Sequence, residues 1–254
     1  MKAWLVALAL SILGAVARAQ EPACAPGDAA ATATVRAVID GRTLALDDGR
    51  TVRLAAIDVP PPFAAGATAA LAALVDGREV ALSPLAPAAD RYGRRRMRAF
   101  VNPGGKPLWV EAALAARGLA LAAPGSDPAC RAALRAAERA ARTARIGLWN
   151  PAARLGADDP AAVLRGRGGF ALVEGKVLSV RESGGTIYLN FGRRWTEDFT
   201  VTILKRNGRR FMSEGLDPKG FQGHRVRVRG YVEARGGPWI EAASPDQIEL
   251  ADEP

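Results

Sequence analysis

The chain has 254 residues, 49% hydrophobic and 24% charged, which is the composition of a globular protein and excludes disorder throughout. One histidine, His224, and two cysteines are too few for the three or four ligands of a usual zinc site or for a multi-histidine catalytic centre. Lys and Arg number 35 against 26 Asp and Glu, a formal net charge of +9 that favours polyanionic partners such as nucleic acid or anionic lipid.

Residues 1–19 have the pattern of a secretory signal peptide. Lys2 precedes an apolar run from Ala3 to Val16, and the small-x-small sequence Ala17-Arg18-Ala19 follows it. We therefore expect cleavage near Ala19 and export to the periplasm or to the outside of the cell. The alternative is an uncleaved anchor at the membrane surface.

Residues 20–33 are rich in Ala, Pro and Gly and predict a loose leader without a regular element. Cys24 lies in this leader and Cys130 lies more than 100 residues later. Because they are the only two cysteines, and because an exported protein meets an oxidising environment, we predict a disulfide between them. Two unrelated free thiols are the alternative.

Residues 34–149 combine short strands with helices. Asp-Gly pairs at 40–41 and 48–49 separate runs of β-forming residues, which is typical of hairpins. The predicted strands are Thr34–Ile39, Thr43–Leu46, Thr51–Ile57, Glu79–Ser83 and Met97–Val101, and the predicted helices are Ala64–Val75, Trp109–Arg117 and Ala129–Arg145. Five strands mixed with three helices predict an α+β domain.

A second region follows a predicted linker. Residues 150–168 contain Pro, Gly and charged residues without periodicity, which indicates a linker. Residues 169–251 then read as β runs between Gly-rich turns, with a helical piece near Arg210–Gly220. The predicted strands are Phe170–Val180, Thr186–Phe191, Asp198–Leu204, Arg225–Val232 and Trp239–Leu250. This pattern predicts a small all-β barrel of the OB type, with a β-sandwich fragment as the alternative.

Residues 34–149 resemble the staphylococcal nuclease (thermonuclease) family over essentially the whole length of its domain. The match is carried by Val38–Leu44, Val52–Pro60, Asp90–Arg94 and Arg117–Ala120, together with Glu138, Arg142 and Gly147–Trp149, in order and at family-like spacing. The resemblance implies an OB barrel of five strands with three helices. It also implies calcium-assisted phosphodiester hydrolysis, in which carboxylates hold the cation, a Glu activates water and two arginines bind the phosphate.

Part of this machinery is retained in the sequence. The resemblance places Arg53 and Arg94 at the two phosphate-binding arginines, whose guanidinium groups match phosphate oxygens. It places Asp58 at a metal-ligand position, and Asp40 matches another Asp of the family site.

Two substitutions depart from the family pattern. Arg42 stands where the family has a metal-ligating Asp, and Pro61 stands where it has the general base. Loss of a general base costs about 10²–10⁴ in rate. At this site Asp40 and Asp58 are accompanied by three arginines, Arg42, Arg53 and Arg94. We expect Arg42 to take the place of the cation. No metal cofactor is expected, and Asp58 would be the ligand of Ca²⁺ if one were bound.

We therefore expect an exported protein that binds DNA, RNA or another phosphate polyanion and has lost most or all hydrolytic activity. An active phosphodiesterase, with Glu111 or Asp90 as a substitute base, is the first alternative. A cell-envelope module that binds an anionic membrane surface is the second. A drifted site with Arg42 turned to solvent is also compatible with the sequence.

The second region resembles nucleic-acid-binding OB-like modules, although its motifs are less specific. Arg225, Arg227 and Arg229 alternate with valines and are predicted to share one strand face. Tyr188 and Trp195 lie near further arginines along the sequence. Aromatic and arginine side chains together suit single-stranded nucleic acid. The alternative is that the aromatics belong to the core and the arginines form a solvated face.

Overall fold

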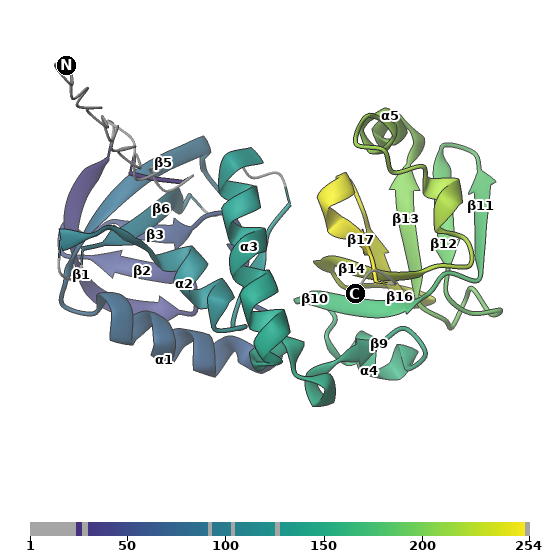
Figure 1. The fold of residues 1–254 in the computed structure, drawn as a ribbon, viewed down its shortest axis with the longest axis horizontal. Coiled ribbons are helices and arrows are strands. Elements are labelled where there is room, and N and C mark those ends of the chain that lie inside the picture. Colours follow the sequence, from purple (N-terminus) through teal and green to yellow (C-terminus); the bar gives the residue numbers. More distant parts are fainter. Residues whose placement is uncertain (1–23, 27–29, 91–92, 103–104, 125–127, 252–254) are drawn as a thin grey trace, which may run out of the picture.

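The computed structural model describes residues 24–26, 30–90, 93–102, 105–124 and 128–251, and the predicted signal peptide lies outside them. Two sheet-rich units lie side by side, and the long helix α3 (Pro128–Ala144) stands between them (Figure 1). Within the described residues, no helix is both long and apolar enough to span a membrane. The predicted α+β class is confirmed.

The first unit is built on a closed barrel of five strands. Its strands are β1 (Ala31–Asp40), β2 (Thr43–Leu46), β3 (Thr51–Leu54), β5 (Glu79–Ala89) and β6 (Arg95–Val101). They follow the order β3-β2-β1-β5-β6, and a parallel pairing of β3 with β6 closes the ring; β7 (Leu108–Trp109) extends the sheet beyond β6. Leu44, Leu46 and Val52 are among the side chains that fill its interior.

The predicted strand Thr51–Ile57 is interrupted. Ala56 adopts a left-handed backbone conformation with φ of 66°, so β3 ends at Leu54 and a short strand β4 (Ile57–Asp58) follows. β4 pairs with β8 (Leu121–Ala122). This break separates Asp58 from strand β3 and places it beside the turn between β1 and β2, where it pairs with Arg42.

The three predicted helices are confirmed, with small shifts at their ends. They are α1 (Ala64–Val75), α2 (Val110–Ala116) and α3, and a 3₁₀ turn η1 (Pro61–Phe63) precedes α1. Ala67, Leu71 and Val75 are buried at a spacing of four residues, so one face of α1 covers the barrel. Gly118 ends α2 with φ of 65°, and a Cβ there would lie 2.4 Å from the carbonyl oxygen of Ile146. Glycine is therefore required where α2 meets the segment after α3.

The predicted disulfide between Cys24 and Cys130 is present, and it fastens the start of the described chain to α3. The Arg98 guanidinium lies against both sulfur atoms, with Nη1 at 3.2 Å from Cys24 Sγ and 2.8 Å from Cys130 Sγ. The predicted leader 20–33 is too long, because β1 begins at Ala31 and pairs with β5 from that residue onward.

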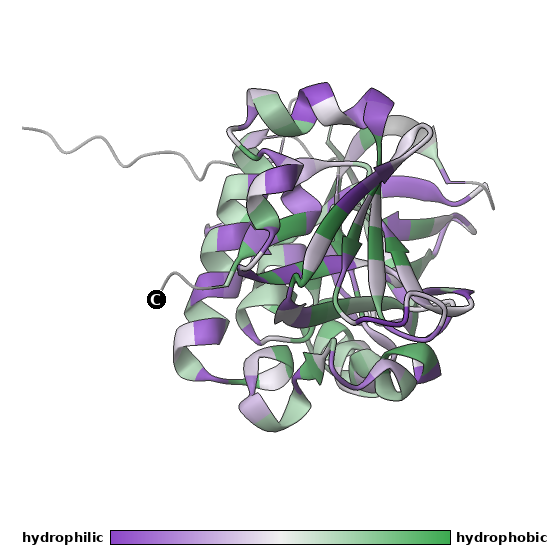
Figure 2. Cartoon of the chain, turned by 90° about the vertical axis from the view of Figure 1, so that its right-hand side faces the viewer, coloured by the Kyte–Doolittle hydropathy of each residue, from purple (hydrophilic) through white to green (hydrophobic). Residues whose placement is uncertain are grey.

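The second unit contains two further sheets. One has the order β17-β14-β10-β9 and the other β11-β12-β13-β16-β15. The strands are β9 (Leu155–Gly156), β10 (Phe170–Lys176), β11 (Ser179–Ser183), β12 (Thr186–Asn190), β13 (Thr200–Leu204), β14 (Arg225–Tyr231), β15 (Glu233–Arg235), β16 (Gly237–Glu241) and β17 (Ile248–Leu250). Hydrophilic and hydrophobic residues alternate along strands of this unit (Figure 2). The inward apolar side chains form a separate core around Phe199 and Phe211.

The short helices of the second unit differ from the prediction. The predicted helical piece near Arg210–Gly220 overlaps the end of α5 (Lys205–Ser213), which begins earlier, and a 3₁₀ turn η5 (Pro218–Phe221) that follows it. The predicted strand Trp239–Leu250 is divided by a 3₁₀ turn η6 (Pro245–Gln247).

The stretch 150–168 is not an unstructured linker. After the 3₁₀ turns η3 (Gly147–Trp149) and η4 (Pro151–Ala153), it forms β9 and α4 (Pro160–Arg165). β9 pairs in parallel with β10, and Val163 of α4 is fully buried in the second core. Asp159 caps α4 by accepting a hydrogen bond from the Ala162 N–H at 2.9 Å. The second unit therefore begins before residue 169.

Candidate functional site

The turn between β1 and β2 places Asp40 and Arg42. Asp40 accepts hydrogen bonds from the backbone N–H of Arg42 at 2.8 Å and from the Thr43 hydroxyl at 3.0 Å. These are the contacts of a carboxylate that stabilises its own turn. A Cβ at Gly41 would lie 2.7 Å from Ala67 Cβ, so the turn packs closely on α1.

Arg42 points to Asp58 and not to solvent. Its guanidinium forms an ion pair with Asp58 Oδ1 and also donates to the carbonyl oxygen of Ile57 at 3.4 Å. The Asp58 side chain is 9% exposed and that of Arg42 is 17% exposed, so the pair is largely shielded from water. The departure from the family pattern at position 42 thus puts a cationic side chain directly on Asp58.

Arg53 approaches the same oxygen of the Asp58 carboxylate. Its Nη2 is 3.6 Å from Asp58 Oδ1. Burial lowers the pKa of the Arg53 guanidinium below its ordinary value, and the positive charges of Arg42 and Arg94 lower it further. The three arginines predicted from the sequence are therefore near enough to act on one another electrostatically.

Arg94 is held by a carboxylate of its own. Its Nε and Nη2 each lie 2.8 Å from Asp90 Oδ2. Asp90 adds a third carboxylate to the two aspartates predicted at this site. The three arginines are then matched by three aspartates, because Arg94 is paired with Asp90. Around Asp58 itself two arginines, Arg42 and Arg53, share one carboxylate, which leaves one positive charge there.

Tyr231 is a site residue that the sequence analysis did not identify. It lies at the end of β14 in the second unit, and its hydroxyl donates to Asp58 Oδ1 at 2.9 Å. The Arg42 Nη2 lies 3.4 Å from the same hydroxyl. Tyr231 continues the alternation of Arg225, Arg227 and Arg229, so its strand face was predictable although its partner was not. We call Arg42, Arg53, Asp58 and Tyr231 the Asp58 cluster.

The Asp58 cluster does not fit a calcium site. Hard cations require several oxygen ligands, and here Asp58 Oδ1 is already surrounded by two guanidinium groups and a hydroxyl donor. Asp40 is bound to its own turn, and Pro61 in η1 offers no side-chain oxygen. In the part of the chain that the structure describes, no group of three or more His, Cys, Asp or Glu side chains is arranged to hold a metal ion.

The two candidate substitute bases have other roles. Glu111 is fully buried in α2, and its carboxylate lies 3.2–3.3 Å from the backbone N–H of Ala99 on β6. Burial raises the pKa of Glu111 to about 8, against the lowering effect of these hydrogen bonds. Asp90 holds Arg94. Glu111 therefore belongs to the packing of α2 on the barrel.

The arginines of β14 do not form an open nucleic-acid surface. Arg229 is 1% exposed and its Nη1 is 2.7 Å from Glu138 Oε1 on α3. Arg227 pairs with Glu174 at 3.0 Å, and Arg225, the most exposed of the three, pairs with the same carboxylate at 3.2 Å. The predicted strand face is correct, but acidic side chains from neighbouring elements cover it.

A network of charges on α3 holds the two units together. Although burial acts to raise the pKa of Glu138, the positive charges of Arg229 and Arg135 outweigh it and leave that pKa below its ordinary value. Glu249 of β17 pairs with Arg142 at 2.7 Å and with Arg135 at 3.3 Å. This network fixes β14 against the first unit and so positions Tyr231 on Asp58.

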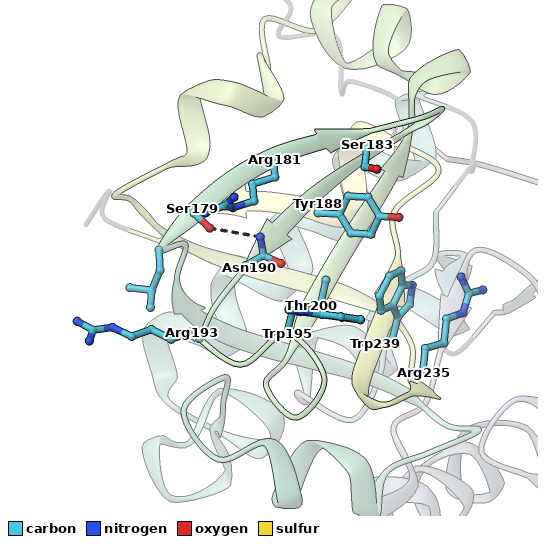
Figure 3. Close-up of a pocket in the computed structure, with 12 residues that line it drawn as sticks. Ser179, Arg181, Ser183, Tyr188, Asn190, Arg193, Trp195, Thr200, Arg235 and Trp239 are labelled. Carbon is cyan, nitrogen blue, oxygen red and sulfur yellow. Dashed lines mark hydrogen bonds between the residues drawn. The ribbon is translucent and has the colours of Figure 1, made fainter.

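Tyr188 and Trp195, the aromatic candidates, lie away from the Asp58 cluster. Both line a groove of about 1090 Å³ on the outer face of the β11–β12–β13–β16 sheet (Figure 3). Trp195 is 68% exposed. Phe191 and Phe199, which are close to them in sequence, face inward and belong to the core.

A comparison with models of protein families supports the resemblance found for the first unit. Residues 51–151 match the family model described as staphylococcal nuclease homologue, a range that includes Arg53, Asp58 and Arg94. No curated protein matches the chain. With its closed barrel of five strands and three helices, the first unit has the fold of the staphylococcal nuclease family, and the family model matches it over residues 51–151.

Proposed function

We propose that this protein binds nucleic acid, DNA or RNA, through its nuclease-type domain, and that its phosphodiesterase activity is lost or weak. The observation that carries the proposal is the ion pair between Arg42 and Asp58. It puts a fixed organic cation where the family's chemistry needs a divalent one. An active phosphodiesterase and an envelope module remain the alternatives.

The charges of the Asp58 cluster support phosphate binding without a metal. Two guanidinium groups share one carboxylate, which leaves one positive charge in a largely buried setting. A phosphate oxygen can approach the donors of Arg53 that Asp58 does not engage, since a guanidinium has five N–H groups. Hydrolysis lacks support there, because Pro61 supplies no base and Tyr231 blocks one side of Asp58.

We further propose that the second unit is an OB-like module. If β10 with β11 and β14 with β15 are each taken as one bent strand, the cyclic strand order is first, second, third, fifth, fourth. The barrel of the first unit has the same order. In each unit a helix, α1 or α5, lies between the third and fourth strands.

Export is part of this proposal. It is supported by the residue pattern of the first 19 positions and by the disulfide, since such bonds persist mainly in oxidising compartments. Attraction to anionic membrane surfaces is a further consequence expected from the excess of basic residues.

We predict that the intact, oxidised chain binds labelled oligonucleotides with an affinity that falls steeply with salt. The logarithm of the association constant should decrease linearly with the logarithm of the salt concentration, by about 0.7 per phosphate neutralised on single strands. Arg53→Ala should lower this slope and weaken binding, whereas Arg209→Ala, which removes an exposed charge from α5, should change neither. Fluorescence anisotropy over a salt titration measures this, and no binding in dilute salt would refute the proposed function.

A further inference from the structure

The groove on the second unit combines aromatic and basic side chains in a way that the Asp58 cluster does not. Its aromatic members are Tyr188, Trp195 and Trp239, and its basic members are Arg181, Arg193 and Arg235. Among the described residues that line it, none is Asp or Glu, although Arg235 is paired with Glu233 at 2.9 Å. The groove is therefore complementary in charge to a polyanion and in surface to flat rings.

The sheet register explains how these side chains come together. Tyr188 is opposite Arg181 across β11 and β12, and Thr200 is opposite both Asn190 and Trp239 across β12, β13 and β16. Side chains alternate between the faces of a strand, so these residues share the outer face while Leu189, Val201 and Ile240 fill the core. Figure 3 shows the residues of the outer face along one side of the sheet.

Two of the three aromatic rings pack against each other, and the third, Trp195, is exposed. Tyr188 and Trp239 meet edge to face, with ring centroids 5.9 Å apart. The Arg235 guanidinium lies over the Trp239 ring at 5.0 Å. Trp195 comes from the segment between β12 and β13 and is the most exposed of the three rings. An exposed tryptophan beside arginines is a stacking surface for a base.

Two buried polar atoms of the groove lack partners within the described residues. The Thr200 hydroxyl and the Trp239 indole N–H form no hydrogen bond there, although the two side chains are only 2% and 9% exposed. Buried polar groups are usually satisfied in proteins. A ligand that enters the floor of the groove would provide the missing partners.

We propose that this groove binds single-stranded nucleic acid, with bases stacked on Trp195 and Tyr188 and phosphates bound by Arg181 and Arg193. This inference rests on the proposed function and adds, to the phosphate contacts proposed for the first unit, a stacking site for single strands on the second unit. Double-stranded nucleic acid keeps its base faces covered, so the stacking part of the site selects single strands.

The test uses the intact, oxidised chain and a labelled single-stranded oligonucleotide of about 12 nucleotides, a length that a groove of this type spans. Trp195→Ala should weaken binding about fivefold or more without changing the salt slope, because stacking releases no counterions. Arg193→Ala should lower the slope by about 0.7. Met212→Ala and Arg209→Ala remove an exposed apolar side chain and an exposed charge outside the groove, and both should bind as the unaltered chain does.

The outcomes separate the two proposals. If the chain binds oligonucleotides and Arg53→Ala weakens binding but Trp195→Ala does not, the groove inference is wrong and the proposed function stands. If Trp195→Ala weakens duplex binding equally, or reduces co-sedimentation with anionic vesicles instead of oligonucleotide binding, the groove does not recognise single strands. A complete lack of nucleic-acid binding overturns both proposals.

Discussion

Replacing Arg229 by methionine should lower the free energy of unfolding by about 3 kcal/mol, because breaking a buried ion pair leaves the other charge uncompensated. Arg229 and Glu138 are each 1% exposed, and Nη1 of the arginine lies 2.7 Å from Oε1 of the glutamate. Arg135, 3.2 Å from Glu138 Oε2, keeps one partner for the carboxylate and so places the loss at the lower end of the range for buried pairs. Urea unfolding followed by tryptophan fluorescence measures the change.

A second substitution shows whether the orphaned charge is the cause. In the unaltered chain the Ala122 N–H donates to Glu138 Oε1 at 2.6 Å. Adding Glu138→Gln to Arg229→Met removes the charge but keeps an acceptor for this N–H. The double variant should regain most of the lost stability. Arg225→Met, on the same strand but half exposed, should cost less than about 1 kcal/mol. A similar loss for Arg225→Met and Arg229→Met would show that the Glu138 pair has no special part in joining the units.

Removal of the disulfide should have an effect of similar or greater size. Cys24 and Cys130 are 106 residues apart, so the bond restricts the unfolded chain over a long loop. In the chain-entropy model a loop of about 100 residues corresponds to roughly 4–5 kcal/mol, and the Cys24→Ala/Cys130→Ala chain should be destabilised by that order. The urea midpoint with and without reductant measures it. The variant itself should not respond to reductant, and equal midpoints for the oxidised chain and the variant would contradict the prediction.

The local features of the fold were predictable because short-range chemistry determines them. The Asp40-Gly41 turn, the Ala-rich helix α1 and the hydrophobic alternation along β12 each depend on neighbours in sequence. The disulfide was predictable because the chain has two cysteines only. Asp159-Pro160 at the start of α4 was a helix-start signal as well, but the glycines and charges around it indicated a linker.

The features that involve both units were not predictable from local patterns. Alternation placed Arg229 on one face of β14, and Tyr231 continues that alternation, but the pattern did not reveal that α3 and Asp58 would cover this face. The contact between Tyr231 and Asp58 joins residues 173 positions apart, and it depends on the docking of one unit on the other. Arg42 was predicted to replace the cation beside Asp58, and in the structure the two side chains form an ion pair.

The most direct measurement is a calorimetric titration of the intact chain with Ca²⁺. If the Arg42 guanidinium occupies the place of the cation, no saturable heat should appear, because Asp58 is already paired and, among the described residues, no three His, Cys, Asp or Glu side chains are grouped to hold a metal ion. Saturable binding of one Ca²⁺ per chain that disappears in Asp58→Asn would contradict this account and restore the metal-dependent nuclease as the better explanation.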